Sequence, residues 1–247
     1  MTSQPLLGRS ALITGGARRV GAEIARTMHG AGACVLIHYQ TSEHAAADLA
    51  QELNRARPDT AAVQREDLLS AEAPENLVSA AVRTFGGLDV LINNASSFAP
   101  TRMGEITRAQ WNDLIGTNLQ APLFLAQAAV PSLAERRGLI LNIVDIHGLR
   151  PLKGYPVYSA AKAGLAMLTR SLARELGPEI RVNGIAPGPV LWPEHGMDEA
   201  LKREIVGKTA LQRHGSPEDV ARTALFLAGD APYITGQIIA VDGGRSI

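Results

Sequence analysis

Short apolar runs alternate along this chain with longer segments in which apolar residues recur every three or four positions. The runs are typical of buried strands and the longer segments of helices with one buried face. The predicted strands are Arg9–Thr14, Ala33–Tyr39, Ala61–Glu66, Leu88–Asn93, Leu139–Asp145, Ile180–Ile185 and Gln237–Val241. The predicted helices are Arg19–Ala31, Glu43–Ala56, Glu72–Phe85, Arg108–Ala134, Pro156–Leu176 and Pro217–Ala228. This order predicts parallel strands joined by crossover helices in one doubly wound α/β domain over residues 1–247.

The alternation is interrupted between residues 191 and 211. Irregular segments of this length in a compact domain commonly serve function, so we expect a lid over a substrate. Leu191 and Trp192, at its start, are candidate walls of the substrate pocket.

Composition narrows the kind of ligand. The 24 basic and 24 acidic side chains leave no net charge to attract nucleic acid or an anionic membrane, which favours a small molecule. There is no N-terminal apolar leader and no apolar run approaching about 18 residues, so we expect a cytoplasmic protein. The only cysteine, Cys34, lies in a strand-like run and is expected to be a buried thiol. The six histidines are dispersed, and no ligand set has metal spacing.

The first predicted strand leads directly into the turn T-G-G-A-R-R-V-G at residues 14–21, and a helix follows. Glycines let a backbone bend tightly against a pyrophosphate, and a helix N-terminus offers it unpaired N–H groups. We therefore expect Gly15, Val20 and Gly21 to bind a dinucleotide. Arg19 occupies a place where glycine is usual in such turns.

The second predicted strand ends in H-Y-Q-T-S at residues 38–42, without the acid that would pair with the ribose of NADH. NADPH is therefore the expected cofactor. Its 2′-phosphate would be met by a set of polar residues that comprises Arg18, Arg19, His38, Thr41 and Ser42, with Tyr39 beside them. The alternative for Arg18 and Arg19 is that they are solvated residues at a helix start.

Two further turns are expected to contact the cofactor. Asp67 and Leu68 follow the third strand and would meet the adenine edge, although Asp67 is also compatible with a helix cap. Asn94, Ala95 and Ser96 follow the fourth strand in a turn of small residues where the backbone of a cofactor could pass.

Candidate chemistry lies between Asn142 and Gly164. Tyr158 and Lys162 are four residues apart on a predicted helix and share a face, and a nearby ammonium is expected to lower the pKa of the phenol. Asp145 closes the preceding strand, at the end where open α/β sheets bind ligands. The alternatives are a solvated Tyr–Lys pair and an aspartate that only caps a turn.

With T-G-x-x-x-R-x-G at 14–21, N-N-A-S at 93–96, Asn118, Y-x-x-x-K at 158–162 and P-G at 187–188, the chain resembles the short-chain dehydrogenase/reductases over its whole length. The resemblance implies a seven-stranded Rossmann-like sheet, a nicotinamide cofactor and a homotetramer in which the helices after strands four and five pack across a two-fold axis.

Within that family the chain resembles the pteridine reductases, because of Arg19, Asp145 in place of the usual serine, and the turn N-N-A-S-S-F. The resemblance implies hydride transfer from NADPH to a C=N bond of a pteridine. Phe98 would stack on the pterin ring, with an ordinary loop anchor as the alternative, and Arg19 and Ser96 would contact pterin and cofactor. Gln40 and Thr41 depart from the H-Y-x-R-S form of this group, which bears on the strength of the NADPH preference.

The resemblance also implies roles. Tyr158 would donate the proton, Lys162 would hold the nicotinamide ribose, Asp145 would orient or share the proton, and Asn118 would support Lys162 through a water. The residues expected along the nicotinamide carboxamide are Pro187, Gly188 and Val190. Two alternatives remain: a reductase of carbonyl substrates such as 3-oxoacyl thioesters, and a non-catalytic NADPH-binding sensor.

Overall fold

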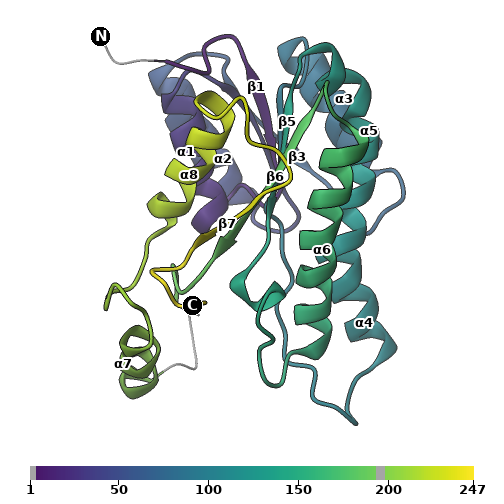
Figure 1. The fold of residues 1–247 in the computed structure, drawn as a ribbon. Helices are drawn as coiled ribbons and strands as arrows, with labels where there is room; N and C mark the ends of the chain where they lie inside the picture. Colours follow the sequence, from purple (N-terminus) through teal and green to yellow (C-terminus); the bar gives the residue numbers. More distant parts are fainter. Residues whose placement is uncertain (1–3, 193–197) are drawn as a thin grey trace.

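The computed structural model describes residues 4–192 and 198–247, and its centre is one parallel sheet (Figure 1). Seven strands lie in the order β3-β2-β1-β4-β5-β6-β7, and every neighbouring pair is parallel. The strands are β1 (Ser10–Ile13), β2 (Cys34–Tyr39), β3 (Ala61–Arg65), β4 (Val90–Asn93), β5 (Leu139–Ile143), β6 (Arg181–Pro187) and β7 (Ile238–Val241). The predicted fold class is therefore confirmed.

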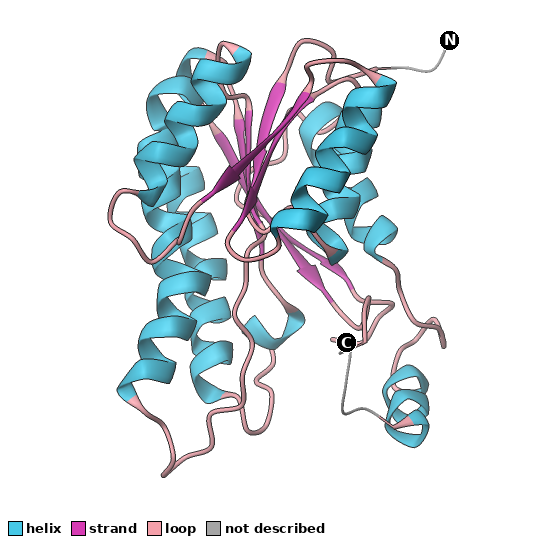
Figure 2. Ribbon diagram, turned by 180° about the vertical axis from the view of Figure 1, so that it is seen from behind, coloured by secondary structure: helices cyan, strands magenta, loops and turns pink. Residues whose placement is uncertain are grey.

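Helices cover both faces of this sheet (Figures 1 and 2). One layer packs on one face and consists of α1 (Arg19–Gly30), α2 (Glu43–Ala56) and α8 (Pro217–Gly229). The other layer consists of α3 (Ala73–Phe85), α5 (Ala121–Glu135) and α6 (Pro156–Glu175). Side chains alternate across each strand, so Ile13 of β1 faces the first layer and Leu12 the second. Both faces are thus buried, which explains why the strands appear in the sequence as continuous apolar runs.

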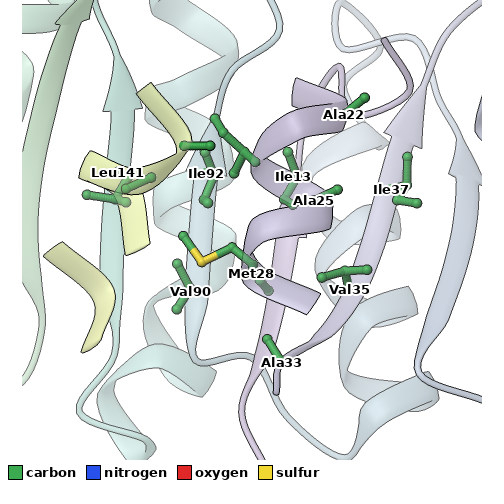
Figure 3. Packing of buried hydrophobic residues seen from close by; sticks show 14 of the residues in the cluster. Ile13, Ala22, Ala25, Met28, Ala33, Val35, Ile37, Val90, Ile92 and Leu141 are labelled. Carbon is green, nitrogen blue, oxygen red and sulfur yellow. The ribbon is translucent and has the colours of Figure 1, made fainter. Parts of the chain in front are cut away.

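The core on the first face is formed by β-branched strand residues and small helix residues (Figure 3). Ile92 of β4 is fully buried there, as is Met28 of α1. Ala22 and Ala25 allow α1 to approach the sheet closely, and this fixes the start of α1 beside the end of β1.

The predicted helix Arg108–Ala134 is present without a gap, but it is not α-helical throughout. The structure has α4 (Arg108–Ile115), a π-helical turn at Gly116–Gln120 and then α5. Pro122, in the first turn of α5, has no N–H to donate back to this region. Such π-turns are frequent at functional sites, and this one holds Asn118.

The segment 191–211 contains a helix that was not predicted, α7 (Glu199–Gly207), which begins where the Asp198 carboxylate accepts a hydrogen bond from the N–H of Leu201. No residue of α7 is buried. In Figure 1 it lies apart from the two helical layers. The part of the expected lid at 193–197 lies outside the described residues, and the lid function stays a prediction.

Cys34 is partly exposed, and the expectation of a buried thiol was therefore wrong. It is the first residue of β2, and the five residues that follow it in the strand are buried.

We expect Ile92→Ala to lower the free energy of unfolding by about 2–5 kcal/mol, because the site is closely packed and leaves a cavity. Urea denaturation checks this. Leu7→Ala, at a position that is 68% exposed, is the control and should change the value by less than about 0.5 kcal/mol. Equal effects of the two substitutions would contradict the packing described.

Candidate active site

The site lies where the direction of the chain connections reverses. From β1 the chain proceeds outward through β2 to β3, and β4 then returns to the other side of β1. The carboxyl ends of β1 and β4 therefore open into a crevice, the usual ligand position in open α/β sheets. A cleft of about 550 Å³ extends from the turn after β1 to Tyr158 and Lys162.

Most of the predicted site residues line this cleft. They are Gly15, Arg18, Arg19, Val20, Gly21, His38, Tyr39, Thr41, Ser42, Asp67, Leu68, Asn94, Ala95, Ser96, Asp145, Tyr158, Lys162, Pro187, Gly188, Val190 and Leu191. Three predicted residues are not among its walls: Phe98, Asn118 and Trp192. Sequence reasoning missed the lining residues Ala17, Gln40, Leu69, Asp113, Thr117, Ile143 and Val144. Most adjoin predicted residues, whereas Leu69 and Asp113 carry no recognisable signal.

The glycine turn is held against β4. The Thr14 hydroxyl accepts hydrogen bonds from the N–H groups of Asn94 and Ala95 at 3.0 and 3.1 Å. In return the Asn94 amide donates to the carbonyls of Thr14 and Gly15 at 2.9 and 3.0 Å. A Cβ on Gly21 would lie 2.3 Å from the Gly15 carbonyl oxygen, so the turn closes only with glycine there. The bare backbone that results suits a pyrophosphate.

Arg19 adopts a left-handed conformation, with φ of 55°. This explains why glycine is usual at the position, since other residues are strained there. The guanidinium donates to the Trp192 carbonyl at 3.2 Å, linking the turn to the segment after β6. The Trp192 ring in turn packs on the His214 ring, with centroids 4.4 Å apart. Trp192 is thus a support behind the cleft.

His38 does not have the surroundings expected of a phosphate ligand. Its side chain is 2% exposed, Nδ1 accepts from the N–H of Gly15 at 3.1 Å, and Nε2 lies 3.2 Å from the Glu66 carbonyl oxygen. Burial lowers the pKa of the imidazole. Backbone groups thus lie at both ring nitrogens in this arrangement, and the contact between His38 and a 2′-phosphate stays a prediction.

Asp67 does not cap a helix, because α3 begins later, after Glu72. Its carboxylate accepts a hydrogen bond from the N–H of Leu69 at 3.0 Å and shapes the turn after β3. Asp67 and Leu68 both line the cleft, and their contact with adenine stays a prediction.

Asp145 both caps a turn and contacts the reactive phenol, so the two roles considered for it from the sequence occur together. One carboxylate oxygen accepts from the N–H of His147 at 2.8 Å and starts the 3₁₀ turn Ile146–Gly148. The other accepts from the Tyr158 hydroxyl at 2.7 Å. The capping bond fixes the carboxylate, so its second oxygen is aimed at the phenol.

Tyr158 and Lys162 are both buried on α6. The Lys162 ammonium donates to the Ile143 carbonyl at 2.9 Å and lies 5.8 Å from the centroid of the Tyr158 ring. The predicted lowering of the Tyr158 pKa was wrong in sign: burial raises it, and the charge of Asp145 and the hydrogen bond to it raise it further. Burial also lowers the pKa of Lys162 to about 8, against the opposing effect of Asp145.

Asn118 lies behind the cleft and is fully buried. Its amide donates to the carbonyls of Ser97 and Leu114, each at 2.9 Å, and its oxygen accepts from the Ser96 hydroxyl at 2.6 Å. Asn118 therefore orders the turn after β4. Its predicted link to Lys162 through a water stays a prediction.

Three aromatic rings meet beside the reactive phenol. Phe98 is 52% exposed and stacks on Tyr155, with centroids 4.6 Å apart and an interplanar angle of 13°. Its edge contact with Tyr158 has a centroid distance of 4.8 Å. Phe98 is therefore a loop anchor in this arrangement that also presents an apolar surface next to Tyr158. Tyr155 was not predicted.

Residues 4–192 and 198–247 contain neither a candidate metal cluster nor a candidate membrane-spanning helix. No group of three or more His, Cys, Asp or Glu side chains is placed to bind a metal ion. None of the helices in this part of the chain is both long and apolar enough to cross a lipid bilayer.

A switch-point cleft with a bare phosphate turn at one end and a buried Tyr–Lys–Asp group at the other defines a dinucleotide-dependent enzyme of the doubly wound class. Residues 15–246 match the family model described as enoyl-(acyl carrier protein) reductase. The chain belongs to the short-chain dehydrogenase/reductase family, as its motifs indicated.

Similar proteins include two reductases and one solved structure. Pteridine reductase 1 of Leishmania tarentolae is 38% identical, with 100% of this chain and 99% of the relative covered. 3-Oxoacyl-(acyl-carrier-protein) reductase FabG of Staphylococcus aureus (strain Mu50) is 35% identical, with 96% and 97% covered. A blue fluorescent protein from a metagenomic library, solved in complex with NADPH, is 34% identical with a TM-score of 0.92, and 98% and 100% are covered.

The lowered pKa of Lys162 predicts how stability responds to pH. Between about 8 and the ordinary lysine value of 10.5, the unfolded chain binds a proton that the folded chain has released, so stability should rise with pH through this window. We expect urea unfolding of the ligand-free protein at pH 7.5 and 9.0 to show this increment, and Lys162→Met to lack it. The same pH dependence in both proteins would contradict the assignment.

Proposed function

We propose that this protein is an NADPH-dependent pteridine reductase, which transfers hydride to a C=N bond of a dihydropterin, dihydrofolate or biopterin. The observation that carries the proposal is the hydrogen bond from Tyr158 to the Asp145 carboxylate. The pteridine reductase and the 3-oxoacyl reductase are 38% and 35% identical to this chain. So small a difference in identity does not decide which of their substrates this protein reduces. Asp145 is the discriminating residue.

The cleft suits NADPH, because glycines at Gly15 and Gly21 leave the backbone bare at the turn. The pyrophosphate would lie on this turn, with Arg18, Thr41 and Ser42 near the 2′-phosphate. Pro187, Gly188 and Val190 would lie along the carboxamide, and Lys162 would hold the ribose. When bound, NADPH supplies the hydride that reduces the carbon of the C=N bond.

Tyr158 is the proton donor in this proposal. Its raised pKa keeps the phenol protonated at neutral pH. With cofactor and substrate bound, the phenol would pass this proton to the ring nitrogen of the reduced bond. Asp145 holds the hydroxyl in place. The negative charge of Asp145 also favours a substrate that offers N–H donors, such as a pterin amino group, over a carbonyl oxygen that needs a donor.

Residues around Tyr158 would hold the flat substrate. Phe98 borders the phenol through the aromatic contact, and Ser96 borders it through a hydrogen bond to Tyr158. A substrate would stack on the face of Phe98 that Tyr155 does not cover. Arg19 and Leu191 line the same cleft. They would form the wall on the side of the proposed lid, and Trp192 would support this wall through the hydrogen bond that its carbonyl accepts from Arg19.

We propose a homotetramer, on the basis of the family resemblance and of exposed apolar side chains on the helices after β4 and β5. Phe124 of α5 is 42% exposed and Met167 of α6 is 61% exposed. Side chains of this size on two helices of one layer are typical of an interface.

Light scattering after size-exclusion chromatography tests the assembly. The wild type should have about four times the chain mass of 26.1 kDa, and Phe124→Glu should reduce it, because the interface would bury an unpaired charge. Leu201→Glu on α7 is the control and should leave the mass unchanged. A monomeric wild type would overturn this part of the proposal.

Substitution of Asp145 tests the substrate class. We expect Asp145→Ser and Asp145→Asn to reduce kcat/KM for 7,8-dihydrobiopterin at least about tenfold, because each removes a charge-assisted hydrogen bond. Asp113→Asn, which alters another carboxylate of the cleft that is bonded to Ser97, should have a smaller effect.

The same series measured with acetoacetyl thioester decides between the two enzymatic candidates. The proposal expects little turnover by the wild type and a gain in Asp145→Ser. Efficient thioester reduction by the wild type, unaffected by Asp145→Asn, would contradict it.

A further inference from the structure

We propose that His38 is a positioning residue for the cofactor, which sets the conformation of the phosphate-binding turn through a neutral imidazole that accepts the N–H of Gly15. The inference rests on the proposed binding of NADPH in the cleft. It goes beyond the reaction itself, since the ring acts on the turn and not on a ligand.

Backbone groups on both sides of the ring specify its protonation. The N–H of Gly15 can only donate, so Nδ1 must accept, at 3.1 Å. The Glu66 carbonyl can only accept, so Nε2, at 3.2 Å, must carry the proton. The imidazole is thus held neutral, in one tautomer, between β1 and the end of β3.

His38 also binds the turn through its backbone. Its carbonyl accepts from the N–H of Gly16 at 2.9 Å, so one residue of β2 engages two successive N–H groups of the turn. On the opposite side, the Asn94 amide donates to the Gly15 carbonyl at 3.0 Å. The peptide groups on either side of Gly15 are fixed from both neighbouring strands.

This clamp explains how a strained turn keeps one shape. Gly15 has a positive φ of 59°. Arg19, four residues later in the same turn, also has a positive φ, which is the conformation that favours glycine. Without the acceptor on His38, the part-buried N–H of Gly15 would lose its partner. The turn would then relax toward a shape with poorer contact to the phosphates.

Calorimetric titration with NADPH tests the role without any assumption about the substrate. His38→Phe keeps a buried ring but removes both nitrogens, and should weaken NADPH binding about tenfold or more. His38→Asn keeps an acceptor near the position of Nδ1, and should retain affinity within about threefold. His29→Phe is the matched control: His29 is equally buried and bonded to the Thr60 hydroxyl at 2.7 Å, remote from the turn.

The control separates positioning from stability. His29→Phe should lower the melting temperature and leave NADPH affinity unchanged. Wild-type affinity in a folded His38→Phe, or affinity as weak in His38→Asn as in His38→Phe, would overturn the inference. Failure of the wild type to bind NADPH would instead overturn the proposed function.

A pH series covers the case in which His38→Phe does not fold. NAD⁺ is the probe, because its phosphates do not titrate between about pH 4.5 and 7.5. The series extends to the lower value because burial lowers the pKa of His38. Protonation of His38 removes the acceptor, so wild-type affinity should fall at the acidic end, and His38→Asn should respond less. Asp67, after β3, acts on the ring through its charge and favours the imidazolium, and Arg18 and Arg19 on the turn line the same cleft. Identical pH profiles would overturn the inference.

Discussion

The parallel pairing of β1 with β4 is the constraint on which the rest of this structure depends. It places two strand ends, which the sequence separates by about 80 residues, side by side. The Thr14 hydroxyl and the Asn94 amide then tie the two turns together. Every other part of the cleft is arranged around this junction: β2 supplies His38 on one flank, and β5 with α6 supplies Asp145, Tyr158 and Lys162 on the other.

At the far end of the cleft, burial and charge determine what the reactive group can do. Tyr158 is buried beside a carboxylate, which holds the proton on the phenol, and Lys162 is buried with one carbonyl partner, which weakens its hold on its own proton. The ligand-free site therefore keeps a proton on the phenol, beside a lysine that releases its own proton more readily than usual. A serine in place of Asp145 would remove the negative charge and leave a hydroxyl that can donate to a carbonyl oxygen. The side chain at this position therefore favours either reduction of a pteridine C=N bond or reduction of a carbonyl.

Much of the fold could be predicted because strands buried on both faces appear as unmixed apolar runs, and the glycine turn has its own signature. The π-turn that holds Asn118 within the predicted helix Arg108–Ala134 could not, because such a turn hardly changes the spacing of apolar residues. The short helix α7 does have a signal in retrospect, Asp198 as its cap with Leu201 and Ile205 behind it.

Within the site, the list of lining residues was largely predictable, whereas several roles were not. The sign of the Tyr158 pKa shift depends on burial, and spacing alone does not reveal burial. The function of the His38 ring depends on two backbone groups, on Gly15 and Glu66, that only the assembled sheet brings to it. Phe98 was expected to face the substrate, and its contact with Tyr155 arises from a loop whose path the sequence does not indicate.

The most direct test of this account is the wild-type substrate preference, measured as NADPH oxidation with 7,8-dihydrobiopterin, dihydrofolate and acetoacetyl thioester offered in parallel. The account predicts turnover of a pterin or folate with a kcat/KM at least about a hundredfold above that of the thioester, a difference of some 3 kcal/mol in transition-state binding. Turnover of the thioester alone would contradict it. Tight NADPH binding with turnover of none of the three would instead favour a non-catalytic sensor.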